Sequence, residues 1–69
     1  MIEVFKTNVQ ETEQSKIIVT KLLEHFPNSN INFDLEDCDK ILRVHALSFS
    51  SSQIIELLDS YGYKCEVLV

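Results

Sequence analysis

The chain has 69 residues, of which 45% are hydrophobic, and its eleven acidic and six basic side chains give a net charge of −5. This length allows one domain, residues 1–69, and no apolar run approaches the ~20 residues of a membrane-spanning helix. The acidic balance and the scattered bases argue against nucleic-acid binding, which needs clustered Lys and Arg.

The start of the chain and its cysteines indicate a cytoplasmic protein with free thiols. Met1-Ile2-Glu3 is followed directly by strand-like sequence, without the basic region or small-residue cleavage site of a secretory signal. The two cysteines are Cys38 and Cys65. In the fold predicted below they fall in a hairpin tip and a distant strand, so we expect no disulfide between them.

The first half of the sequence predicts a strand, a helix and a second strand. Residues 2–9 are rich in β-forming side chains and carry no helical stripe. Thr12 is placed to cap the helix that follows, and Pro27 is placed to end it. The apolar stripe of this helix consists of Ile18, Val19, Leu22, Leu23 and Phe26. Residues 30–35 alternate between polar and apolar side chains, which is typical of a strand with one wet face.

The second half predicts a hairpin, a second helix and a last strand. Residues 36–39 form a polar reversal and residues 40–45 a returning strand. Ser50 and Gln53 have the spacing of a capping box, and Gly62 falls where a left-handed residue closes a helix. The buried stripe of this helix is predicted to contain Ile54, Ile55, Leu57, Leu58 and Tyr61. The residues after Gly62 alternate into the last strand.

The order of these elements predicts an α+β fold. Such a chain closes as a ferredoxin-like βαββαβ sandwich, a four-stranded antiparallel sheet with two helices on one face. The other face stays open, and if Leu42 and Val44 point inward, Ile41, Arg43 and His45 line it. The neighbouring strands complete this predicted interaction face with Asn32, Asp34 and Leu68.

The first strand is ambiguous in one respect. Ile2 and Val4 lie on one side of its alternation, while Glu3, Phe5 and Thr7 lie on the other. Whichever side is buried, some apolar side chains face water. Single exposed apolar residues are normal in proteins, whereas a contiguous apolar patch indicates a partner or a dimer.

Four segments of the chain, residues 5–9, 19–23, 39–44 and 54–63, are similar to parts of one known family. They resemble the heavy-metal-associated domain, the small soft-metal carrier of copper chaperones and pump tails. Residues 5–9 resemble the strand that enters the metal loop of that family, and residues 19–23 resemble its first-helix core. Residues 39–44 resemble its third strand, and residues 54–63 its second helix and the close of that helix. The resemblance covers nearly the whole chain and implies the same fold, although a shared fold does not carry function with it.

The metal motif of that family is missing here. In the family the loop ends in Cys-x-x-Cys, and two thiolates at a helix start hold one soft ion such as Cu(I) or Zn(II). Glu11 and Gln14 occupy those positions, and Asn8 replaces a common glycine. A carboxylate and a neutral amide do not suit Cu(I). We therefore expect no metal and no cofactor, and we interpret Glu11 and Glu13 as favourable charges near a helix start.

Other patterns do not indicate a site. The hairpin tip lacks the glycine and terminal glutamate of an EF-hand loop, although it is rich in acids: Asp34, Glu36, Asp37 and Asp39. His25 and His45 have no second His or Cys at ligand spacing. Capping explains the serines at 50–52. Acids also occupy the place where an acylphosphatase needs a basic, glycine-rich anion loop, so we expect no enzyme activity.

Three function classes follow. The leading hypothesis is a metal-free relative that acts as a small non-enzymatic binding or adaptor module, through a protein partner or self-association. The alternative is a metal-ion binding or carrier protein with a rebuilt site lacking Cys-x-x-Cys, formed by Glu11, Glu13 or Cys38 or by ligands shared across a dimer. The third is a small-ligand sensor, as ACT-type domains of the same topology are, and such domains usually pair to make their pocket.

Overall fold

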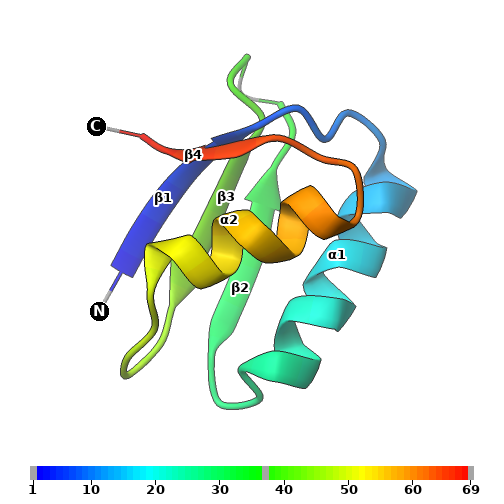
Figure 1. Cartoon of the computed structure of the whole chain (residues 1–69). Coiled ribbons are helices and arrows are strands. Elements are labelled where there is room, and N and C mark those ends of the chain that lie inside the picture. Colours follow the sequence, from blue (N-terminus) through cyan, green and yellow to red (C-terminus); the bar gives the residue numbers. More distant parts are fainter. Residues whose placement is uncertain (1, 37, 69) are drawn as a thin grey trace.

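The computed structural model of the chain describes residues 2–36 and 38–68. Its elements are β1 (Ile2–Thr7), α1 (Thr12–His25), β2 (Asn30–Asp34), β3 (Ile41–His45), α2 (Ser51–Ser60) and β4 (Cys65–Val67). The four strands form one antiparallel sheet in the order β2-β3-β1-β4, and both helices pack on the same face of it (Figure 1). This arrangement is the predicted α+β, ferredoxin-like sandwich.

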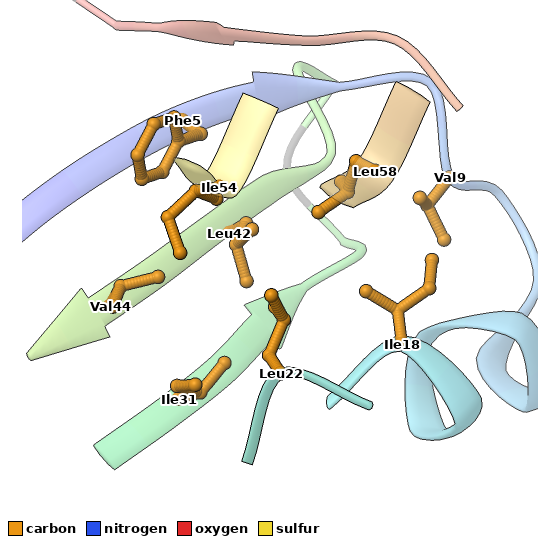
Figure 2. Packing of buried hydrophobic residues seen from close by; sticks show 9 residues of the cluster. All are labelled: Phe5, Val9, Ile18, Leu22, Ile31, Leu42, Val44, Ile54 and Leu58. Atoms are coloured by element: carbon orange, nitrogen blue, oxygen red, sulfur yellow. The ribbon is translucent and has the colours of Figure 1, made fainter. Parts of the chain in front are cut away.

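One apolar core fills the space between the sheet and the two helices (Figure 2). The strands and the first loop contribute Phe5, Val9, Ile31, Leu42 and Val44, and the helices contribute Ile18, Leu22, Ile54 and Leu58. Burying one side chain of this kind stabilises a fold by about 1.5–3 kcal/mol. The apolar stripes predicted for the helices lie in this core or against it, except that Tyr61, at the end of α2, is 38% exposed.

The pairing of the strands settles which side of β1 is buried. Phe5 pairs with Leu42 on one side and with Val67 on the other, and it is completely buried, whereas Ile2 is 62% exposed. Residues two apart on a strand share a face. Glu3 and Thr7 therefore accompany Phe5 on the helix side of the sheet, and Ile2, Val4 and Lys6 lie on the helix-free side.

Two boundaries near the start of the chain differ from the prediction. The first strand ends at Thr7 rather than at residue 9. The side-chain Oδ1 of Asn8 accepts a 2.8 Å hydrogen bond from the backbone N–H of Lys64, where a regular ladder would use a backbone carbonyl. The cap of α1 is Glu11, and Thr12 is the first residue of the helix.

The two ends of α2 follow the sequence prediction. Ser50 and Gln53 form a capping box, in which the backbone N–H of Ser50 donates to Oε1 of Gln53 over 3.2 Å. At the other end the N–H of Tyr63 donates to the carbonyl of Leu58 over 2.9 Å, and Gly62 has a φ of 89°. Gly62 thus ends the helix in a left-handed backbone conformation, which residues other than glycine adopt only with strain.

Candidate functional site

The loop between β1 and α1 is the segment that the resemblance to the heavy-metal-associated family predicts as the metal loop. Thr7 fixes the start of this loop, because its hydroxyl donates to the carbonyl of Lys40 over 2.7 Å and accepts from the N–H of Val9 over 3.3 Å. Asn8 donates its own N–H to the carbonyl of Lys64 over 3.2 Å. The loop is thus tied on one side to the β2–β3 hairpin and on the other to the start of β4.

Glu11 and Gln14, at the two positions where the family has cysteine, form a capping box at the start of α1. The side chain of Glu11 accepts from the backbone N–H of Gln14. In return, Oε1 of Gln14 accepts from the N–H of Glu11 over a rather long 3.4 Å. A helix start leaves its first N–H groups without partners inside the helix, and this pair gives partners to two such donors.

This set of donor atoms does not fit a soft metal ion. Carboxylate and amide oxygens are hard ligands, and here they already accept backbone hydrogen bonds. Within residues 2–36 and 38–68, no three His, Cys, Asp or Glu side chains gather where they would hold a metal. Of the four acids at the predicted hairpin tip, Asp37 lies outside the described residues.

The two cysteines are free thiols that lie in different surroundings, as predicted. Cys38 is exposed near the hairpin tip, whereas Cys65 is half-buried in β4. Burial, and secondarily the negative charge of Glu66, raises the pKa of Cys65 to about 12. Metals and electrophiles react with the thiolate, and the raised pKa favours the protonated thiol of Cys65 at neutral pH.

The predicted interaction face corresponds to the helix-free side of the sheet. Three rows of paired residues cover it, namely Ile2–His45–Asn30, Val4–Arg43–Asn32 and Lys6–Ile41–Asp34. Leu68 extends the middle row, since its N–H donates to the carbonyl of Val4 over 2.9 Å. The structure therefore places all six predicted residues of this face on one side of the molecule.

The accessible apolar surface of this face lies on its β1–β4 side. Ile2 and Leu68 are 62% and 40% exposed, and Val4 between them is half-buried. We name these three residues the sheet-face patch. Ile41 lies in the row between Lys6 and Asp34 and is only 3% exposed, so it contributes little to the surface. The sequence pattern identified Leu68 but left Ile2 and Val4 undecided, because only the strand pairing shows which side of β1 is buried.

The β2–β3 side of the same face is polar and loosely connected. Arg43 approaches Asp34 diagonally, with 3.9 Å between Nη2 and Oδ2, and both side chains are 40% exposed or more. An exposed ion pair at this separation contributes between zero and about 1 kcal/mol. His45 and Asn32 are exposed as well, so the polar side chains of this side lie in contact with solvent.

Sequence analysis did not anticipate a groove of about 480 Å³ beside the edge strand β4. One wall comes from α2, with Ile55, Glu56 and Asp59, and the other includes Tyr63 and Cys65. The lining is completed by Lys6, Thr7, Asn8, Lys64 and Glu66. The groove thus joins the end of β1 to the last part of the chain, and only the packing of α2 on the sheet and the pairing of β1 with β4 bring these segments together. The groove falls in the size range of small-ligand pockets, but it is an open channel along a strand edge.

Comparisons of the chain with protein-family models, with curated proteins and with solved structures find no match. The resemblance to the heavy-metal-associated domain therefore stays a prediction from the residues quoted above. Within the described part of the chain, no helix has the length and apolar character required to cross a bilayer.

Proposed function

We propose that the chain is a small non-enzymatic binding module in the cytoplasm, a relative of the heavy-metal-associated domain that no longer binds a soft metal. One observation carries this proposal: Glu11 and Gln14, at the two metal-ligand positions, form the cap of α1. The side chains that would carry the ancestral chemistry thus have a structural role. The free thiols of Cys38 and Cys65 agree with a reducing compartment.

The proposed binding surface is the sheet-face patch. Its three residues are neighbours across β1 and β4, so their exposed apolar area is contiguous. The helices leave this side of the sheet uncovered (Figure 1). Scattered apolar residues on a surface need no explanation, but a contiguous group of them favours contact with another protein.

The loss of metal binding is tested by restoring the missing motif. We expect the reduced native protein to bind no Cu(I) in an anaerobic competition titration, and no Zn(II) at micromolar concentration. The double variant Glu11→Cys with Gln14→Cys should bind one Cu(I), because it places two thiolates at the start of α1. The fold should survive, since both residues are on the surface or half-buried.

Two outcomes of this titration contradict the proposal in different ways. One-to-one binding by the native protein, lost on Glu11→Ala, would support the alternative of a rebuilt metal site. Failure of a folded double-cysteine variant to bind Cu(I) would show that the loop does not have the metal-loop geometry, and the resemblance to the family would fall.

The sheet-face patch is tested with a pair of matched substitutions. Ile2→Asp places a charge on the patch, and Ile17→Asp places the same charge on α1, at a residue that is 61% exposed compared with 62% for Ile2. A protein retained from native lysate by the unmodified chain and by Ile17→Asp, but not by Ile2→Asp, would support the patch as the binding surface. Equal retention of the partner by all three proteins would contradict the proposed surface. So would the result that none of the three proteins self-associates or captures any protein.

A further inference from the structure

The strand β4 leaves one side of its backbone unpaired. It is the last strand in the sheet order β2-β3-β1-β4. Lys64 accepts from the N–H of Asn8, and Leu68 donates to the carbonyl of Val4, so these two residues direct their backbone groups toward β1. Because hydrogen bonding alternates along an antiparallel strand, Cys65 and Val67 direct their N–H and C=O groups outward, to the edge of the sheet.

This edge is accompanied by the groove described above. In Figure 1, α2 crosses the helix side of the sheet, and the connection from its end leads into β4 at the rim. The lining of the groove is partly apolar, with Ile55, Tyr63 and Cys65 all half-buried. The free backbone groups of β4 and a channel for side chains therefore lie next to each other.

The charges around the groove differ on the two sides of the strand. On the helix side, Glu56 and Asp59 are both exposed and line the wall formed by α2. On the helix-free side, Glu66 pairs with Lys6 across the sheet, and Lys64 lies two residues away. The wall formed by α2 thus carries two negative charges, while the helix-free side of the same groove, with two lysines and one glutamate, carries a net positive charge.

These charges disfavour a second copy of the chain as the occupant of the edge. An antiparallel pair of β4 strands related by a two-fold axis would form one continuous sheet with both α2 helices on the same side. Glu56 and Asp59 would then face the same residues of the second copy, and like charges at close range are destabilising. A basic strand would instead place cations against them.

We propose that the outer edge of β4 binds an extended segment of a partner protein that carries Lys or Arg on the side facing α2. The segment adds a fifth strand by pairing with Cys65 and Val67, which is the β-augmentation mode of peptide recognition. The aliphatic parts of the Lys or Arg side chains of this segment contact Ile55 and Tyr63, and their charged ends lie beside Glu56 and Asp59. This edge adjoins the sheet-face patch only at Leu68, and the substitution that tests the patch, Ile2→Asp, lies outside the paired part of β1 and β4, so either proposal can fail without the other.

The proposal is tested with the peptide acetyl-Thr-Lys-Val-Arg-Val-Lys-Thr-amide, titrated to millimolar concentration against the ¹⁵N-labelled native protein. Paired residues share a face of the sheet, so the peptide residues that bond to Cys65 and Val67 are those whose side chains face α2. We expect shifts of the Cys65 and Val67 amide signals and slower hydrogen exchange at both. The same peptide with an N-methylated Arg, which lacks one required donor, should not produce them.

A pair of double variants tests the charges. Glu56→Gln with Asp59→Asn should weaken peptide binding roughly three- to tenfold, because each exposed charge pair contributes little alone. Glu13→Gln with Glu24→Gln removes the same charge from exposed positions on α1 and should leave the affinity within twofold.

Three results would overturn the proposal: no shift at millimolar peptide, equal binding of the N-methylated peptide, or equal weakening by the two double variants. The proposal would also be overturned if, without any peptide, the Cys65 and Val67 amides became more protected from hydrogen exchange as the protein concentration rises. That result would assign the edge to a second copy.

Discussion

The two faces of the sheet are made from alternate residues of the same strands, yet they have different roles. On the helix side, Phe5 and Leu42 are paired with each other and completely buried. On the helix-free side, the corresponding row holds Val4 and Arg43, which are partly or largely accessible. The helix side therefore contributes most of the stability, and the other side is more accessible to a partner. Substitutions on the two faces measure how complete this division is.

The largest effect is expected for Leu42→Ala. Leu42 lies in the centre of the sheet and points into the core between both helices (Figure 2), and it has no accessible surface. Removing its side chain leaves a cavity that the surrounding strands cannot close, so the free energy of unfolding should fall by about 2–5 kcal/mol. Urea denaturation followed by circular dichroism measures this. A loss below about 1 kcal/mol would mean that the core relaxes freely around the site.

Ile41→Ala tests the division on the helix-free face, where Ile41 is the one buried apolar residue among those that the structure describes. Ile41 is 3% exposed, but no helix covers this side, and its flanking neighbours are Lys6 and Asp34. Flexible surface side chains can fill the gap, so no cavity should remain. The free energy of unfolding should then fall only by the transfer free energy of the lost atoms, about 1.5–3 kcal/mol. The same denaturation experiment checks this. A loss equal to that of Leu42→Ala would show that the two faces contribute alike.

The helix side of the sheet could be read from the sequence, because several signals agreed there. The stripe of α1, the capping box of Ser50 with Gln53 and the closing Gly62 each depend on residues close together in the chain. Local patterns of this kind specify where helices begin, end and bury their apolar side. The order of the elements then left one compact arrangement for the sheet.

The candidate surfaces could be read only in part, because they depend on contacts between distant segments. Strand alternation placed Arg43 and His45 on the open face but did not show that Ile41 is buried there. Residues 2–7 had apolar side chains on both sides, and their orientation follows from pairing with β3 and β4. The cap of α1 was assigned to Thr12 instead of Glu11, since threonine is the commoner cap and the capping role of Glu11 depends on Gln14.

An effect that depends on pH is expected from Cys65, on the helix side at the edge of the sheet. Its thiol has an ordinary pKa of 9.0, which the folded protein raises to about 12. Above pH 9 the thiol ionises in the unfolded chain but stays protonated in the folded one, so its contribution to stability is lost as the pH rises from 9 to 12. Urea midpoints across this range should fall less for Cys65→Ser than for the native protein. Cys38→Ser, at an exposed thiol, is the control and should behave like the native protein.

The smallest effect is expected for Arg43→Ala on the helix-free face. Arg43 neighbours Leu42 in the chain, but its guanidinium is exposed and meets Asp34 at 3.9 Å. Water screens such a pair, and holding both side chains in place costs entropy, so stability should change by about 0.5 kcal/mol or less. A double-mutant cycle with Asp34→Ala isolates the pair, and its coupling should lie within the same limit. A coupling above about 1 kcal/mol would show that the polar side of this face is a fixed part of the fold. It would weaken the view that the helix side contributes most of the stability.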